Sequence, residues 1–452
     1  SLLAGVNNTG DVSNGVSIRG GSLDQNLMSY ESAPVFNPTH LFGLFSVFTP
    51  DVVSGVNIYQ ANIPAKYGGR IASVVDVKVK NPYTDRLKIE GGIGVISSRF
   101  TISTPIIRDK LMLLAGGRVG FTDFLFPLLI PRLKNTKANF SDSTVNLLYL
   151  PNENNQLTYT HFYSKDFYQL DLISSIENIV SSSNQYDFGT SNHTLRWLHG
   201  FENNTNLVGT LVHSSYLPKN LFPEIDSSNV IQFESQIQYT SAQFEYKDNS
   251  KDEFDYYAGV QFNQYNINPG SLDPGSGNSI IPVDLSNEKS QEFSFFTNFN
   301  WNLSKRLSIS SGIRLTHFSL LGPYDQGLYD KDGFFEGTNT IASNESIATY
   351  TNPEPRLGLN YKLGEYSSLK MSYASIYQYI QNIYNTSTPL PTSRWKISDS
   401  YILPQKNDTY GLGIYKNYPK TGIDFSVESY YRNTQNNLTY KPGANFFLSE
   451  FL

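Results

Sequence analysis

The chain has 452 residues, no cysteine and a net charge of −6; 14% of its residues are aromatic and only 16% are charged, against about 25% in soluble domains. The lack of cysteine excludes a disulfide scaffold, and the lack of any long apolar run excludes a helical membrane protein. Because the net charge is negative and no basic cluster occurs, a nucleic-acid partner is not expected.

The first 80 or so residues are rich in glycine and small residues. Short β-like runs at 16–19, 56–59 and 74–79 alternate with the turn signals of paired glycines and of Asn-Pro. We predict a compact, loop-rich α+β domain over residues 1–82, in which residues 51–54 begin or end a short helix.

From about residue 86 the sequence alternates apolar and polar residues in segments of about 9–14 residues. The run 307–316 is typical, because its odd positions are leucine, isoleucine and one serine, while its even positions are serine, glycine, arginine and threonine. A period of two predicts strands with one apolar and one polar face.

The connections between these segments alternate between short polar turns and long loops rich in Gly, Pro, Asn, Ser and Asp. Short turns are predicted at 152–155, 202–204, 247–253, 304–305, 364–366 and 417–419. Long loops are predicted near 123–142, 167–186, 217–229, 268–290, 320–353 and 378–407. This asymmetry is the layout of an outer-membrane barrel.

We therefore predict, over residues 83–452, a transmembrane antiparallel up-and-down β-barrel with about 14 strands in this chain. The alternative is a soluble sandwich or propeller, whose strands also alternate faces. It is disfavoured because strands of ten or more residues exceed the usual length of about 5–6. Tyrosine and phenylalanine also cluster at the predicted strand ends, as in the aromatic girdles of membrane barrels.

Three elements near the N-terminus carry a family resemblance. Residues 16–26 read VSIRGGSLDQN, residues 33–48 read APVFNPTHLFGLFSVF, and residues 56–70 read VNIYQANIPAKYGGR, before VVDVKVK at 74–80. In this order they resemble the plug domain of TonB-dependent outer-membrane receptors of the Bacteroidetes type. The family's acidic-glycine pair is replaced here by Glu31-Ser32.

The resemblance also implies a complete barrel of about 22 strands, more than this chain supplies. The segment that binds TonB and a leading carboxypeptidase-like domain are likewise absent. We therefore expect a fragment truncated at both ends, with residues 1–82 as an N-terminally truncated plug and residues 83–452 as a C-terminally incomplete barrel.

The function implied by the resemblance is TonB-dependent active import of a scarce nutrient across the outer membrane of a Gram-negative bacterium. Expected partners are the TonB energy-coupling complex and outer-membrane lipid, and a surface lipoprotein lid is a further candidate. The alternative is a β-rich surface adhesin or binding protein without transport activity. The substrate stays open among siderophore, cobalamin, glycan and peptide.

No enzymatic chemistry is expected, since the sequence contains neither a P-loop nor a G-x-S-x-G motif. No cofactor, catalytic residue or metal site is predicted. The six histidines are scattered, and only His199 and His213 flank one predicted hairpin, where they could approach each other.

Two arginines are candidates for anchoring the plug. Arg19 and Arg70 lie in the plug-like elements, and the resemblance implies that they pair with glutamates of the barrel wall. The candidate partners are the inward-facing acids Glu245, Glu292, Glu354 and Glu428. The alternative is that both are surface arginines without a structural role.

The candidate substrate-binding residues are Phe36, Asn37, His40 and Phe42. They lie in a loop that we expect to face the external vestibule, where aromatic and amide side chains suit sugars or other polar organic ligands. The alternative is that the apolar residues of this loop are the core of the plug.

Overall fold

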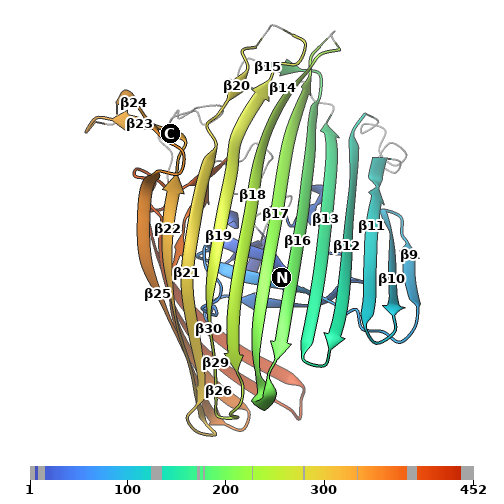
Figure 1. Ribbon diagram of the computed structural model, residues 1–452, viewed down its shortest axis with the longest axis vertical. Helices are drawn as coiled ribbons and strands as arrows, with labels where there is room; N and C mark the ends of the chain where they lie inside the picture. Colours follow the sequence, from blue (N-terminus) through green and yellow to red (C-terminus); the bar gives the residue numbers. More distant parts are fainter. Residues whose placement is uncertain are drawn as a thin grey trace.

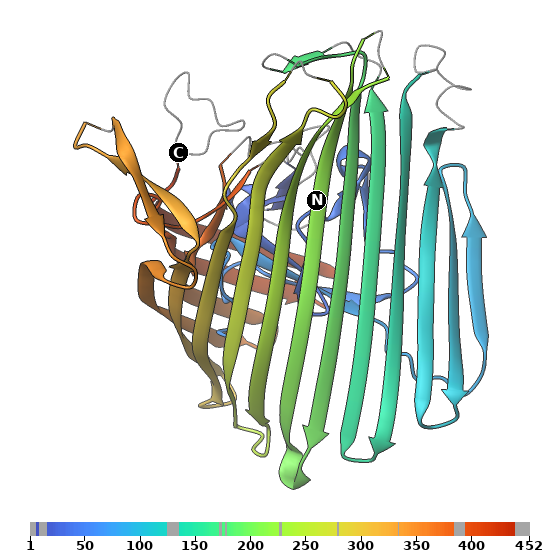
Figure 2. The ribbon, with the colours of Figure 1, turned by 45° about the horizontal axis from the view of Figure 1, so that its top comes forward.

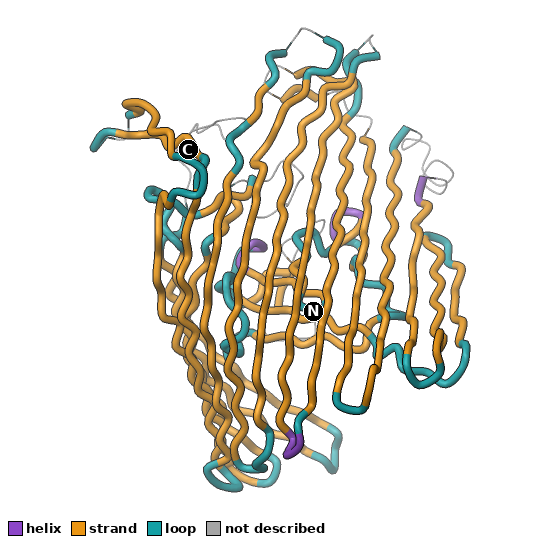
Figure 3. The backbone as a smooth tube through the Cα atoms, in the orientation of Figure 1, coloured by secondary structure: helices purple, strands orange, loops and turns teal. Residues whose placement is uncertain are grey.

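The computed structural model describes residues 6–8, 16–123, 135–170, 174–176, 179–225, 228–277, 280–332, 334–383 and 394–438. No helix within these ranges is long and apolar enough to span a bilayer. Strands dominate, and Figure 3 shows that helical turns in the described parts are few and short.

The main sheet is antiparallel and contains 16 strands, 15 of which follow one another from β9 to β30 while β20 pairs with β19 (Figure 1). Their bounds are β9 Lys88–Ile93, β10 Ser97–Ile107, β11 Leu111–Phe121, β12 Lys137–Asn152, β13 Asn155–Leu170, β16 Asn184–Gly200, β17 Thr205–Pro223, β18 Val230–Asp248, β19 Phe254–Asp273, β20 Val283–Asp284, β21 Glu288–Asn302, β22 Leu307–Leu321, β25 Ser346–Gly364, β26 Ser367–Gln378, β29 Gln405–Tyr418 and β30 Ile423–Gln435.

The predicted up-and-down order is confirmed, because each long strand pairs with the next long strand along the chain. The sheet curves around the N-terminal part of the chain, which lies on its concave side (Figure 2). Within the described residues, β9 and β30 are its two edges and do not pair with each other. The concave face is called the wall below.

The short turns fall where the sequence predicts them, but several strands are longer than expected. Strand β19, at 20 residues, is the longest, and β17 runs on to Pro223 through part of the loop predicted at 217–229. The long connections contain two-stranded pairs of their own. These are β14 Ser174–Ile176 with β15 Ile179–Ser181, β23 Tyr324–Tyr329 with β24 Phe335–Ile341, and β27 Ile380–Asn382 with β28 Trp395–Ile397.

The burial of the long strands is the reverse of that in a soluble protein. On β22 the apolar side chains Ile313 and Leu315 are 43% and 44% exposed, whereas Arg314 and Thr316 between them are each 1% exposed. The predicted alternation is therefore confirmed, with the apolar face outward and the polar face inward. Lipid-facing apolar residues and a polar interior are the pattern of outer-membrane barrels.

The N-terminal unit, residues 16–80, is built on a four-stranded sheet in the order β4-β3-β8-β7. Its strands are β3 Asn26–Tyr30, β4 Ala33–Pro34, β7 Val53–Tyr59 and β8 Ser73–Val79, and only β3 and β8 are parallel. Smaller elements complete the described N-terminal part of the chain: β1 Val6–Asn8, β2 Val16–Ile18, β5 Thr39–His40, β6 Phe45–Ser46 and the 3-10 turns η1 Leu23–Gln25 and η2 Leu41–Gly43.

The α+β prediction for this unit is wrong within the described residues, which contain strands and 3-10 turns there. Val53 begins β7, so the helix expected at 51–54 does not form. Runs of β-branched residues separated by glycine and proline favour strands over a helix. The core of the unit is shared with the wall, because Val52 and Val77 cluster with Leu114 and Phe162.

Candidate functional site

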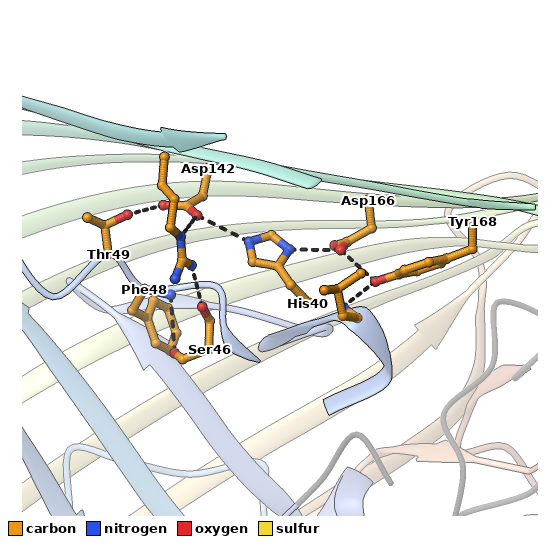
Figure 4. A network of polar contacts seen from close by, with 9 residues as sticks. His40, Ser46, Phe48, Thr49, Asp142, Asp166 and Tyr168 are labelled. Carbon is orange, nitrogen blue, oxygen red and sulfur yellow. Dashed lines mark hydrogen bonds and ion pairs between the residues drawn. The ribbon is translucent and has the colours of Figure 1, made fainter. Parts of the chain in front are cut away.

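The interface between the N-terminal unit and the wall is the candidate site. His40 lies in this interface within a network of polar contacts (Figure 4). His40 is 0% exposed, and its Nδ1 lies 2.8 Å from Asp166 Oδ1 on β13. Its Nε2 lies 3.2 Å from Asp142 Oδ2 on β12. Two adjacent wall strands therefore hold one histidine of the N-terminal unit between their carboxylates.

Further donors complete this histidine network. Arg118 Nε donates to Asp142 Oδ2 at 2.8 Å, and Thr49 donates its hydroxyl to the other oxygen of Asp142. Tyr168 donates its hydroxyl to Asp166 Oδ1 at 2.6 Å. Both carboxylates are thus bonded from several sides, as buried charges require.

The pKa of His40 is raised above its ordinary value of 6.5. Burial acts in the opposite sense, because it disfavours the charged ring. The hydrogen bonds to Asp142 and Asp166 and the attraction of their charges outweigh that effect. The structure therefore gives His40 no nitrogen free for a ligand, although the sequence suggests it as a substrate-binding residue.

Arg19 contacts a glutamate of the last described strand. Its Nη2 lies 2.9 Å from Glu428 Oε2 on β30, and its guanidinium lies 5.2 Å from the ring centroid of Tyr430. Tyr415 donates its hydroxyl to the other oxygen of Glu428 at 2.8 Å. This contact joins the first plug-like element to the edge of the wall.

Arg70 is placed differently. Its side chain is 5% exposed, its Nη1 donates to Gly69 O at 2.8 Å, and its guanidinium lies 5.4 Å from the ring centroid of Trp395. Among the described residues no carboxylate lies within ion-pair distance of it. Glu292, one of the expected partners, lines a small cavity together with Arg70 and accepts a hydrogen bond from Asn263.

The other two expected glutamates are taken by wall residues. Glu354 pairs with Arg356 at 2.9 Å, and Glu245 pairs with Lys247 at 3.0 Å. Of the four expected glutamates, Glu428 alone makes an ion pair with either plug arginine in the described structure.

Two wall arginines that the sequence prediction missed bind the N-terminal unit from the other side. Arg356 Nη1 donates to Ile63 O at 3.1 Å, and Arg314 Nη1 donates to Lys66 O at 3.2 Å. Both arginines are buried. Their signal in the sequence is an arginine at an inward position of an alternating strand, where a buried, desolvated charge is costly without a partner.

The four candidate substrate residues do not form one cluster. Phe36 lies 6.1 Å from Tyr216 and 5.7 Å from Trp395 between ring centroids, and it lines a cavity of about 230 Å³ together with Arg70. Asn37 is half-buried in the adjoining bend. The side chain of Phe42 lies outside the described residues, so the prediction for it stays a prediction.

The core alternative for this loop has support as well. Leu41 is 4% exposed within the largest buried cluster, and Phe36 and Phe45 pack against that cluster. Phe36 packs against this core and also lines the cavity, so its substrate role stays a prediction.

His199 and His213, the two histidines that flank one hairpin, do not lie opposite each other. His199 lies opposite Leu207, whereas His213 lies opposite His193 in the same pair of strands. No group of three or more His, Cys, Asp or Glu within the described parts of the chain could hold a metal ion.

A family model for the TonB dependent receptor-like β-barrel matches residues 108–449, which is well over half of the chain. The chain belongs to the TonB-dependent receptor family. Comparison with curated proteins gave no match. Members of this family are transporters of the Gram-negative outer membrane, so membership supports outer-membrane nutrient uptake for this receptor.

Solved structures share the fold. The chain is similar to the alcaligin outer-membrane receptor of Bordetella pertussis, with 13% identity and a TM-score of 0.64 over 98% of this chain and 68% of that chain. It is similar to a ferric enterobactin receptor mutant of Pseudomonas aeruginosa, with 14% identity and a TM-score of 0.66 over 96% and 68% of the two chains.

The ferric yersiniabactin uptake receptor of Yersinia pestis gives 14% identity and a TM-score of 0.65 over 96% of this chain and 68% of that chain. At such identities the similarity shows the fold alone. The receptor chain described here spans about two thirds of the length of these structures.

Proposed function

We propose that this receptor imports a scarce nutrient across the outer membrane by a TonB-dependent mechanism. In this proposal residues 1–82 act as the plug, residues 83–452 act as the barrel, and substrate binds between the plug loops and the barrel wall. The observation that carries the proposal is the inverted sheet, with its apolar face outward and a separate unit attached to its polar inner face.

Anchoring contacts support the same assignment. Arg19 pairs with Glu428, His40 lies between two wall carboxylates, and Arg314 and Arg356 bind carbonyls of the N-terminal unit. We propose that Arg19 and His40 anchor the plug and that Arg70 and Phe36 bind the substrate. Asn37 and Phe42, beside Phe36, are the further candidate substrate contacts.

The proposed partners are the TonB complex, outer-membrane lipid and a surface lipoprotein lid. We propose that the receptor is of the Bacteroidetes type. Siderophore, cobalamin, glycan and peptide are the candidate nutrients. A β-rich surface adhesin is the second candidate function. It would present the same exposed loops but would have no use for a separate unit packed against the polar inner face of the sheet.

Cell fractionation and nutrient uptake test this proposal. The receptor should fractionate with outer membranes and show heat-modifiable mobility on gels. Uptake of one labelled nutrient should fall when the receptor gene is deleted. It should fall likewise in a separate strain that lacks TonB. Unchanged uptake of every candidate nutrient in the deletion strain, combined with a loss of surface adhesion, would favour the adhesin.

A further inference from the structure

The cavity beside Phe36 has the lining of a ligand site. It has a volume of about 230 Å³ and lies between β3, the loop that follows β4, Arg70 and the hairpin of β27 and β28. Its lining is mostly apolar and includes Met28, Val35, Phe36 and Trp395. Small organic ligands are usually held in such sites, with a few polar groups that fix their orientation.

Arg70 is the cationic group of this lining, and among the described residues no carboxylate forms an ion pair with it. Its charge also acts on Glu292, which lines a second cavity together with Arg70. Arg70 donates a hydrogen bond to the carbonyl of Gly69. A buried charge without an ion pair is costly, so an anion bound at this position would be favoured. A guanidinium suits a carboxylate because it can donate two parallel hydrogen bonds.

Asp24 also lines the cavity, but its oxygens are already bonded elsewhere. Ser22 donates to Oδ1 at 2.5 Å, while the side chain of Gln378 and the backbone N–H of Asn382 donate to Oδ2 at 3.3 and 3.2 Å. Asp24 therefore ties the ends of β26 and β27 to the N-terminal unit and makes no ion pair with Arg70.

Trp395 fixes the direction of the guanidinium by stacking, at 5.4 Å from the ring centroid to the arginine carbon. Phe36 meets the Trp395 ring edge-on at an interplanar angle of 75°. The cavity thus combines an aromatic wall with a pre-oriented cation. Its volume is smaller than the roughly 300–1,000 Å³ of a typical drug-sized site, so it has room for about one substituted ring.

We propose that this cavity binds a small aromatic carboxylate, either free or as the terminal group of a larger substrate. The carboxylate accepts hydrogen bonds from Arg70, and the ring packs against Phe36 and Val35. This assignment rests on the proposed import function, since it names the chemistry of the substrate site between the plug and the wall.

Benzoate binding to the purified receptor tests the assignment. The chain contains three tryptophans, so replacing Trp197 and Trp301 with phenylalanine leaves Trp395 as the reporter. Benzoate should change its fluorescence saturably, whereas benzylamine, which matches the ring but reverses the charge, should bind at least tenfold more weakly. Equal binding of the two probes, or no binding of benzoate, would overturn the assignment without any variant.

Variants then locate the site. Arg70→Gln should weaken benzoate binding at least tenfold, and Arg70→Lys should weaken it less. Lys165→Gln, which removes an exposed cation of β13 that is paired to Asp187, should leave benzoate binding unchanged. Benzoate affinity that is the same in Arg70→Gln and the parent protein would overturn the role of Arg70.

Binding and transport separate the two levels of the proposal. Benzoate binding in a receptor whose deletion alters no nutrient uptake would support the site and overturn the import function. TonB-dependent uptake by a receptor that does not bind benzoate would support import and overturn the aromatic carboxylate site.

Discussion

His40 attaches the N-terminal unit to two strands of the wall at once. Its ring bridges Asp142 and Asp166, which belong to adjacent strands. One residue therefore restrains movement of the N-terminal unit relative to both strands. The bridge is strongest when the ring is charged, since both partners are carboxylates.

This bridge should weaken as the pH rises. Because the folded-state pKa of His40 is raised, its contribution to stability is complete below about 6.5 and is lost as the pH rises through the raised value. Resistance of the N-terminal unit to protease should therefore fall between near-neutral and alkaline pH. His40→Gln should flatten this profile, and a parent profile that is equally flat would contradict the prediction.

Arg19 and Glu428 provide a second residue-scale test. A double-mutant cycle with Arg19→Ala and Glu428→Ala should give a coupling of about 1–3 kcal/mol in urea unfolding, because Arg19 is buried. The matched control is the pair Lys165 and Asp187, which is more exposed and should couple by about 0–1 kcal/mol. Equal coupling energies in the two pairs would contradict the anchoring role of Arg19.

At the scale of elements, the alternation of residue types was enough to predict the faces and short turns of the long strands. It was not enough for the strand ends, because β17 and β19 continue beyond the predicted segments, where polar residues occupy both faces. The contacts across the interface could not be predicted from this pattern either, since His40 lies 102 and 126 positions from its two carboxylates. A chain pattern with a period of two carries no information about such contacts.

Glycine on β11 lets the unit approach the wall closely. A Cβ at Gly116 would lie 2.5 Å from Cγ1 of Val52, a core residue with 0% exposure. Gly116→Ala should therefore destabilise the receptor by about 1–3 kcal/mol through overpacking. Gly189→Ala on β16, where a Cβ meets nothing within 4 Å, is the control and should be neutral in the same thermal unfolding experiment. Equal unfolding temperatures for the two variants would contradict the close approach.

For the whole molecule, the question that separates the two candidate functions is whether the outer face of the main sheet contacts water or lipid. The exposed apolar side chains of β22 have counterparts on neighbouring strands, for example Phe295 on β21 and Leu357 on β25. In water such a continuous apolar surface would favour aggregation, whereas in a bilayer it is the lipid-facing band of a barrel. The adhesin alternative and the proposed importer therefore differ in what surrounds this face.

An arginine on that face distinguishes them. Leu315→Arg, at an outward and exposed position of β22, should cost about 2–4 kcal/mol for folding into lipid vesicles if it lies near the middle of the bilayer. Ser319→Arg lies on the same face of β22 closer to its end and should cost about 0–1 kcal/mol, because the cost falls with distance from the midplane. Urea titration of both variants measures the difference. A water-exposed sheet would tolerate the two arginines equally, since surface substitutions away from special features usually change stability by no more than about 0.5 kcal/mol.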